Sequence, residues 1–380
     1  MKITFVLPFA GLAGGIRVTA IYAERLKKRG HEVFVVSLPP DPINPLDQVK
    51  SLLKGKGLLS NKEASHFDDV DVPHQVIERW RPITDADVPD ADVVIATWWE
   101  TAEWVANMSE AKGAKAYFIQ HHEIFEGMPK ERVEATWSLP MHKITISQWL
   151  IDLAQTQYGD SNVSFVPNSV DTDQFYAPQR GKQSVPTVGM LYAPIGWKGC
   201  DVSLKAFSLA AQKIPNLHLV AFGAFDPSEE LPLPAGAEYI KLPAQNAIKD
   251  IYAKCDVWLC GSWSEGFHLP PLEAMACRCP VVSTQVGGPL DIIKEGVNGY
   301  LVPLGDSTAL ADRLVDVLTR PEASWRDMSD AAYATATQYT WDDATERFEA
   351  ALHTAIERRQ RGEFSDLDKP QDVRPQQAPI

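Results

Sequence analysis

The sequence predicts an α/β protein built from two Rossmann-like, doubly wound parallel-sheet domains that face each other across a cleft. Three observations lead to this prediction. Short apolar runs alternate with helical patterns along much of the chain, a polar segment at residues 170–186 interrupts that alternation, and the chain has 380 residues. Alternating strands and helices are typical of parallel sheets, and a chain of this length can form two domains.

The N-terminal half starts with a predicted strand–helix–strand unit. Residues 3–8 are apolar without alternation, which is typical of a parallel strand covered on both faces. Three glycines lie in the loop at residues 9–15, an amphipathic helix follows at residues 16–29, and HEVFVVSL is the second strand. The glycine loop either lets backbone N–H groups approach a ligand closely or is a plain tight turn. Further strands are predicted at residues 93–99, 115–122, 143–148 and 162–168.

A second series of strands and helices follows the polar segment. Strands are predicted at residues 187–194, 218–223, 238–243, 255–260, 280–284 and 298–303, and helices at residues 200–214, 247–254, 307–319, 322–338 and 341–361. We assign residues 1–172 to an N-terminal Rossmann-like domain, 183–340 to a C-terminal Rossmann-like domain, 341–361 to a helix that crosses back, and 362–380 to a disordered tail.

The stretch at residues 261–288 carries the strongest chemical signal. Glu265 and Glu273 lie eight positions apart across a strand end, a turn and a helix start, so both carboxylates could face one cleft. Pro270 and Pro271 suit the first turn of a helix, which places Glu273 in that turn. The free N–H groups at a helix N-terminus favour an anionic ligand. The carboxylates would instead bind hydroxyl groups.

Four segments with chemically useful side chains follow predicted strands. They are residues 11–15, 121–123, 193–198 and 265–273. The carboxyl ends of parallel strands lie at one edge of a sheet, where open α/β folds bind their ligands. Two such edges across a cleft predict an enzyme with two substrates.

Composition limits the partners. The formal net charge of −14 argues against nucleic acid, whose binding depends on clustered lysine and arginine. Leucines interleave with Lys50, Lys54, Lys56 and Lys62, which form either a weak contact with the inner face of a membrane or a solvated loop. The five cysteines show no metal-ligand spacing, so we expect a cytoplasmic protein without a bound metal. No apolar run approaches the roughly 18 residues that span a bilayer.

These motifs together resemble the family 4 retaining nucleotide-sugar glycosyltransferases of the GT-B architecture. The resemblance spans nearly the whole chain. It rests on SEGFHLPPLEAMACRCPVV, which matches the Glu-x7-Glu motif of the family, on WKG before a helix, on VPNSVDTDQF at the domain join, on GHEV and on NGYLVPLGD. It implies metal-independent transfer of a sugar, with retention at the anomeric carbon, from a nucleoside diphosphate sugar to a glycan, lipid-linked or small-molecule hydroxyl.

The resemblance also implies roles for single residues. Glu265 would contact the donor sugar and Glu273 the ribose, while Lys198 and the backbone N–H of Gly15 would meet the diphosphate. The turn before the second carboxylate would complete the donor site with Gly266, Phe267, His268 and Leu269. Candidate catalytic residues are Glu265, His121 and His122, and the sequence leaves open which histidine faces the donor.

Two positions depart from the family pattern, and other functions stay open. Met190 stands where many members carry a second diphosphate-binding arginine, and His268 stands where glycine is common and could reach the donor sugar. A nucleotide-sugar epimerase would share this architecture but need no acceptor. A nicotinamide-dependent oxidoreductase also uses glycine loops, but GLAGG lacks the dinucleotide spacing and no acidic residue ends the second strand. A binding protein without catalysis is the third alternative.

Overall fold

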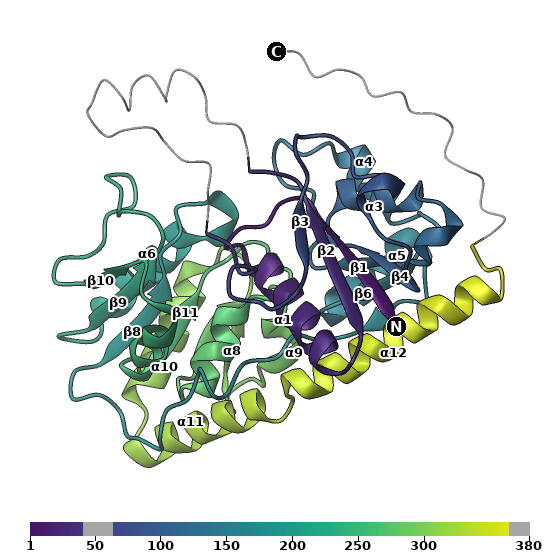
Figure 1. Cartoon of the computed structure of the whole chain (residues 1–380). Coiled ribbons are helices and arrows are strands. Elements are labelled where there is room, and N and C mark those ends of the chain that lie inside the picture. The colour runs from purple at the N-terminus through teal and green to yellow at the C-terminus, as the bar shows by residue number, and fades with distance from the viewer. Residues whose placement is uncertain (41–63, 365–380) are drawn as a thin grey trace.

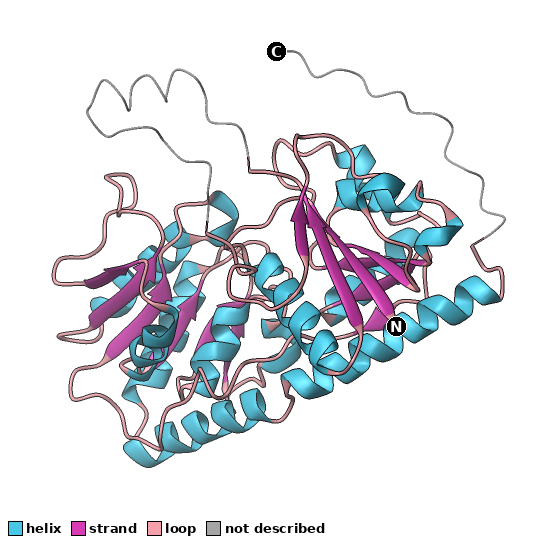
Figure 2. Ribbon diagram, in the orientation of Figure 1, coloured by secondary structure: helices cyan, strands magenta, loops and turns pink. Residues whose placement is uncertain are grey.

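The computed structural model describes residues 1–40 and 64–364, which form two lobes (Figure 1). Each lobe contains one parallel sheet with helices packed around it (Figure 2). The predicted two-sheet α/β fold class is therefore confirmed. The four lysines that we considered for a membrane contact, at positions 50, 54, 56 and 62, lie outside the described residues, as do residues 365–380 of the predicted tail.

The N-terminal sheet has seven parallel strands in the order β3-β2-β1-β4-β5-β6-β7. Their bounds are β1 (Lys2–Leu7), β2 (Glu32–Ser37), β3 (His74–Val76), β4 (Val93–Ala96), β5 (Ala114–Ile119), β6 (His142–Thr145) and β7 (Ser164–Phe165), and the main helices are α1 (Gly14–Lys28), α3 (Trp99–Ala106), α4 (Lys130–Thr136) and α5 (Gln148–Tyr158). The central strands are buried along their length, which explains their unbroken apolar runs.

The C-terminal sheet has six parallel strands in the order β10-β9-β8-β11-β12-β13. Its strands are β8 (Thr187–Leu191), β9 (His218–Gly223), β10 (Glu238–Lys241), β11 (Val257–Cys260), β12 (Val281–Thr284) and β13 (Gly299–Val302), and its helices are α6 (Cys200–Ala211), α7 (Ile248–Ala253), α8 (Leu269–Ala276), α9 (Pro289–Ile292), α10 (Ser307–Thr319) and α11 (Glu322–Thr337). A separate apolar cluster under α6 and α10 forms much of its core.

Several predicted strands extend past their observed ends. The strand predicted at 93–99 stops at Ala96, because α3 starts at Trp99. The Thr101 hydroxyl accepts hydrogen bonds from the backbone N–H groups of Thr97 and Trp98, at 3.0 and 2.9 Å, and so turns the chain into the helix. In the sequence, Trp98 and Trp99 extend the apolar pattern of the strand. In the structure, the hydrogen bonds to the Thr101 side chain end the strand and begin the helix.

The last described helix, α12 (Trp341–Gln360), runs from the C-terminal lobe along the N-terminal lobe (Figure 1). It packs against α1 and against β4, β5 and β6. The Phe348 ring stacks on Tyr22 with 4.3 Å between centroids and meets Phe5 and Phe118, so this helix supplies part of the N-terminal core. The domain boundaries that we assigned from the sequence stay predictions.

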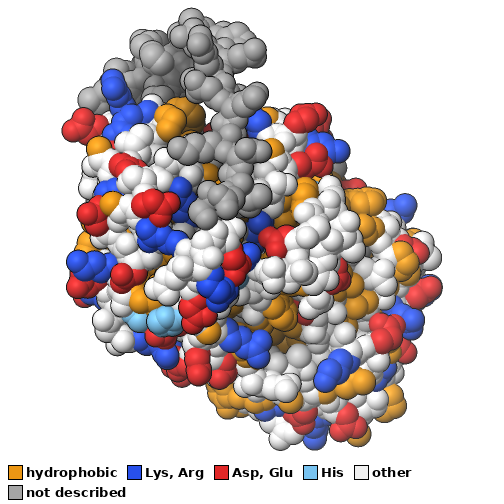
Figure 3. Space-filling model, turned by 90° about the vertical axis from the view of Figure 1, so that its right-hand side faces the viewer, with side chains coloured by type: hydrophobic (Ala, Val, Ile, Leu, Met, Phe, Trp, Pro, Cys, Tyr) orange, Lys and Arg blue, Asp and Glu red, His pale blue; other side chains and the backbone are white. Residues whose placement is uncertain are grey.

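Acidic and basic side chains are interspersed on the face of the molecule drawn in Figure 3. None of the described helices combines the length and the apolar character that a membrane span requires.

Phe348→Ala should destabilise the N-terminal lobe by about 3–5 kcal/mol, because it leaves a cavity among fully buried rings. Urea unfolding, followed by tryptophan fluorescence, measures this loss. His353→Ala on the exposed face of the same helix is the control and should change the free energy of unfolding by less than about 0.5 kcal/mol. Equal effects of the two substitutions would mean that α12 does not stabilise the core.

Candidate active site

The loops that carry the candidate residues follow the strands at which the order of each sheet reverses. In the C-terminal sheet β8 pairs with β11, and Lys198 follows the first strand while Glu265 follows the second. In the N-terminal sheet the reversal lies between β1 and β4, and the loop with Gly15 follows β1. Open α/β sheets bind ligands at such reversals, just outside the carboxyl ends of the strands.

Glu265 is a buried carboxylate with three polar neighbours. Its oxygens accept hydrogen bonds from Lys198 Nζ at 3.0 and 2.8 Å and from Ser262 Oγ at 2.9 Å, and the residue is 6% exposed. Burial alone raises the pKa of Glu265, but His268, the Lys198 ammonium and the Ser262 hydroxyl together bring the pKa below its usual value. The carboxylate is therefore charged at neutral pH, and Lys198 is its counter-ion.

A glycine allows the loops that carry Lys198 and Glu265 to meet. Gly199 has a φ of +55°, and a Cβ there would lie 1.9 Å from the carbonyl oxygen of Gly261. The backbone N–H of Trp263 also donates to the carbonyl of Trp197 at 2.8 Å. The WKG turn and the end of β11 thus pack backbone against backbone, which brings the lysine within reach of the carboxylate.

The helix after Glu265 begins one residue earlier than the prolines indicate. His268 adopts a left-handed backbone (φ 70°, ψ 76°) and caps α8, which starts at Leu269. Our prediction that Glu273 lies in the first helical turn is therefore wrong, since it is the fifth residue and that turn has no acidic residue. A left-handed backbone costs a non-glycine residue roughly 1–2 kcal/mol, so His268 is held under strain.

The His268 imidazole lies beside Glu265. Its Nε2 is 3.6 Å from Glu265 Oε1, and its side chain is 5% exposed. Burial lowers the pKa of His268 to about 4, and the attraction of the Glu265 carboxylate does not restore it. The ring is therefore neutral near pH 7 and exerts its attraction on the Glu265 carboxylate only when it is protonated at acidic pH, so at neutral pH Lys198 and Ser262 are the partners that stabilise the charge of Glu265.

Glu273 is bound by residues from both lobes. Its Oε1 accepts from Arg17 Nη1 of α1 at 2.8 Å, and its Oε2 accepts from the Tyr252 hydroxyl at 2.9 Å. The Arg17 side chain is 20% exposed and the Glu273 side chain 7%. Sequence reasoning missed Arg17, although its place just after two glycines at a helix start was a usable signal.

Gly266 forms a further direct contact between the lobes. Its carbonyl oxygen accepts hydrogen bonds from Ser147 Oγ at 3.1 Å and from Trp149 Nε1 at 2.9 Å, both from the N-terminal lobe. A Cβ on Gly266 would lie 1.8 Å from the carbonyl oxygen of Gln120, so only glycine fits this approach. Gln120 Nε2 in turn donates to the Gly15 carbonyl at 3.0 Å. Predicted donor-site segments of both lobes therefore touch.

The two histidines after β5 point to different places. His121 lies across from the Glu265 loop, with its Nε2 3.2 Å from Ser264 Oγ, and burial lowers its pKa. His122 Nε2 is 2.8 Å from the Tyr158 hydroxyl, and its ring packs on Trp137 inside the N-terminal lobe. The structure brings His121 to the candidate site and leaves His122 outside it, while a catalytic role for either stays a prediction.

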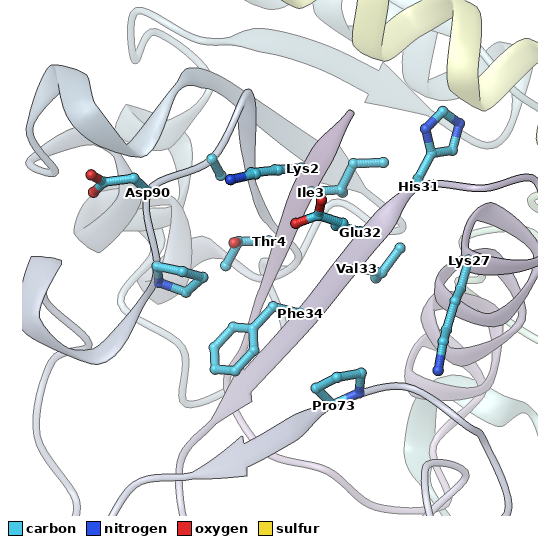
Figure 4. A pocket seen from close by; sticks show the side chains of 12 residues that line it. Lys2, Ile3, Thr4, Lys27, His31, Glu32, Val33, Phe34, Pro73 and Asp90 are labelled. Carbon is cyan, nitrogen blue, oxygen red and sulfur yellow. The ribbon is translucent and has the colours of Figure 1, made fainter.

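Two cavities of the described residues lie elsewhere. One of about 420 Å³ opens at the amino ends of β1 and β2, beside Lys2, Thr4 and Phe34 (Figure 4). Another of about 800 Å³ lies behind α8, between its Leu272 side and α12. Neither is lined by Glu265 or Lys198, so the candidate site is defined by its polar contacts.

The described part of the chain contains no obvious set of metal ligands. The five cysteines are all free and buried. No group of three His, Cys, Asp or Glu among the described residues is arranged to hold a metal ion.

Sequence comparisons find similarity to glycosyltransferases. Residues 182–320 match the family model described as "Glycosyl transferases group 1". The chain is 29% identical over 210 residues to the D-inositol 3-phosphate glycosyltransferase of Mycobacterium leprae, covering 49% of this chain and 48% of that one. It is 38% identical over 91 residues to the N-acetyl-alpha-D-glucosaminyl L-malate synthase of Bacillus anthracis, covering 24% of each. The chain thus spans about half the length, or less, of these curated relatives.

Solved structures match both lobes. Sucrose-phosphate synthase from Thermosynechococcus elongatus gives a TM-score of 0.71 at 16% identity, and covers 94% of this chain and 100% of its own. Anabaena HepE, solved in complex with UDP-glucose, gives 0.68 at 19% identity with the same coverages. The protein has the GT-B fold. The match extends over nearly the whole chain and so includes both lobes.

In this GT-B fold, position 190 does not face the ligand edge. Met190 lies inside β8 and is fully buried in the C-terminal core. An arginine there would enter an apolar cluster, so position 190 cannot supply the second diphosphate cation. Among the described residues, Arg17 is a basic side chain that reaches the second carboxylate of the motif from the facing lobe.

Arg17→Ala should destabilise the protein by about 1–3 kcal/mol, because Glu273 then stays buried without its cation. The exposure of Arg17 reduces this cost below that of a fully buried pair. Thermal and urea unfolding measure the loss. The matched control is Arg25→Ala, which breaks a pair between α1 and the exposed Asp342 and should cost under about 1 kcal/mol. No difference between the two variants would contradict a structural role for the Arg17–Glu273 pair.

Proposed function

We propose that the protein is a retaining glycosyltransferase that moves a sugar from a nucleoside diphosphate sugar to an acceptor hydroxyl. The observation that carries the proposal is the buried Glu265–Lys198 pair at the strand reversal of the C-terminal sheet, facing the N-terminal lobe of a GT-B fold. In the reaction, the bond from the anomeric carbon to the diphosphate oxygen breaks, a bond from that carbon to the acceptor oxygen forms, and the proton of the acceptor hydroxyl passes to the departing nucleoside diphosphate.

The chemistry of the leaving group supports this assignment. A departing nucleoside diphosphate carries negative charge, which an ammonium group and oriented N–H groups stabilise in a water-poor site. Lys198 supplies the ammonium, and Leu269, the first residue of α8, supplies a backbone N–H, since Pro270 and Pro271 after it have none. The backbone N–H of Gly15, at the start of α1, is proposed to complete this anion site from the other lobe.

The carboxylates are proposed to bind hydroxyl groups. Glu265 would accept from the donor sugar and Glu273 from the ribose, where Arg17 and Tyr252 hold its carboxylate in place. Anabaena HepE was solved with UDP-glucose, so UDP sugars are the first donors to test. His121, neutral and opposite Ser264, is the histidine that we propose to meet the donor sugar.

The acceptor is proposed to be a carbohydrate or another polyol. The Phe125 ring of the N-terminal lobe stacks on Trp197 of the C-terminal lobe with 4.7 Å between centroids, and Trp197 is 38% exposed. Both residues lie in the loops that carry His121 and Lys198, and aromatic rings of this kind stack on sugar faces. The name of the Mycobacterium leprae relative also specifies an inositol phosphate acceptor.

We include no metal and no further cofactor in the proposal, because Lys198 and the amides can offset the diphosphate charge. We also place the reaction in the reducing cytoplasm, since the five cysteines are unpaired thiols. The family model and the curated relatives do not favour an epimerase or a nicotinamide-dependent oxidoreductase.

Glu265→Ala should lower kcat/KM for sugar transfer by at least about 100-fold, because the donor sugar loses a charged partner that acts in the transition state. A thermal-shift screen over UDP, GDP, ADP and TDP sugars first selects the donor, since a bound ligand stabilises the folded protein. Circular dichroism checks the fold of the variant. The exposed Glu230→Ala is the control and should keep full activity. Wild-type activity in the Glu265 variant would overturn the assignment.

Sugar transfer should persist after removal of divalent metals. The expected rate in excess EDTA, after dialysis, is within about twofold of the untreated rate, because a lysine and amides supply the positive charge. Lys198→Ala should instead lower the rate by at least about 100-fold under both conditions. Loss of activity in EDTA that returns with magnesium or manganese would show that a metal takes part.

A further inference from the structure

The cavity behind α8 is lined by both lobes and by the segments that join them. Phe165 of β7 belongs to the N-terminal lobe, Phe267 belongs to the C-terminal lobe, and Tyr339 lies between α11 and α12. The volume of about 800 Å³ falls in the range of ligand-binding cavities. Phe267 is shared with the proposed donor turn, whereas Glu265 and Lys198 do not line this cavity.

Two residues that line this cavity have buried polar atoms without a partner. Asn168 is 4% exposed, and its Oδ1 has no hydrogen-bond partner among the residues that the structure describes. The buried Tyr339 hydroxyl also lacks a partner there. Buried polar atoms in folded proteins are nearly always paired, so two unpaired ones at a single cavity indicate a ligand that completes their hydrogen bonds.

The chain holds these two residues together at the join between the lobes. The buried Ser169 hydroxyl, next to Asn168 in the VPNSVD segment, donates to the backbone carbonyl of Tyr339 at 2.6 Å. Burial raises the pKa of Tyr339 to about 12, so its hydroxyl keeps its proton at neutral pH and can donate. The Asn168 amide both donates and accepts. The pair therefore suits hydroxyl groups, which also do both.

The rest of the lining favours an uncharged ligand with apolar faces. Its apolar side chains are Phe165, Pro167, Phe267, Leu272 and Ile292. Its charged side chains are all exposed and have both signs, namely Asp291, Lys294, Asp343, Glu346 and Arg347. A largely apolar wall with a few neutral polar groups is typical of sites for small organic molecules.

We propose that this cavity binds an uncharged saccharide of about two sugar units. Its hydroxyl groups pair with Asn168 and Tyr339, and its apolar C–H faces pack on the Phe165 and Phe267 rings. Because the saccharide contacts both lobes and the join between them, its binding favours the arrangement of the lobes described above.

The test is isothermal titration calorimetry with maltose, cellobiose, lactose and sucrose. At least one of these disaccharides should bind the wild-type protein. Tyr339→Phe removes only a hydroxyl group and should weaken that binding about 3- to 10-fold. Asn168→Leu keeps a similar volume without the amide and should weaken the binding at least about 10-fold.

The melting temperature separates a binding role of the Tyr339 hydroxyl from a structural one. Without ligand, Tyr339→Phe should melt no lower than wild type, because the hydroxyl that it removes has no partner in the described structure. A lower melting temperature would contradict the unpaired hydroxyl on which the proposal rests. The matched control is Tyr176→Phe, which alters a half-exposed tyrosine outside the lining and should bind and melt as wild type does.

Absence of binding by all four disaccharides would mean that water alone pairs with these atoms, and would overturn the proposal. Unchanged affinity in both Tyr339→Phe and Asn168→Leu would overturn it as well. Loss of binding in Trp197→Ala, with Tyr339→Phe unaffected, would instead place the saccharide in the proposed acceptor site. Each of these outcomes leaves the glycosyltransferase proposal standing, because that proposal is tested by the Glu265 and Lys198 variants.

Discussion

The buried Glu265 carboxylate is the constraint on which the rest of the site depends. A charge removed from water needs a partner of opposite sign and further hydrogen bonds, and Lys198 and Ser262 provide them. These three residues can meet only because β8 and β11 are neighbours and because Gly199 lets their loops touch through the backbone. The parallel sheet thus brings Lys198 and Glu265 together, and this ion pair places charged groups at the sheet edge where the binding site is proposed.

Backbone contacts between the lobes extend this constraint across the cleft. Gly266 follows Glu265 directly, and its carbonyl accepts from Ser147 and Trp149 while its Cα lies against Gln120. Any movement of the lobes must therefore move the peptide next to the carboxylate. In the proposed reaction, lobe closure and the placement of the donor-sugar carboxylate would be a single event.

Charges in the ligand-free site are balanced in pairs. Lys198 holds Glu265 and Arg17 holds Glu273, each with a second polar neighbour. Both cations are thus held in place before a diphosphate arrives, so their reorganisation cost is low. His268 adds no charge to this set, because burial lowers its pKa to about 4.

The sequence by itself determined the two parallel sheets, the order of strands and helices along the chain, and the segments that lie at the carboxyl edges. These follow from local patterns, because apolar runs, helical spacing and glycine or proline at turns act within a few residues. The sequence could place Glu265 and Lys198 at one sheet edge, because parallel topology brings both loops there, but their ion pair comes from the tertiary structure. Only the tertiary structure decided that Arg17 meets Glu273, that His121 and not His122 faces the cleft, and that Gly266 touches Gln120. These contacts join residues from distant parts of the chain, and their register depends on how the two lobes pack.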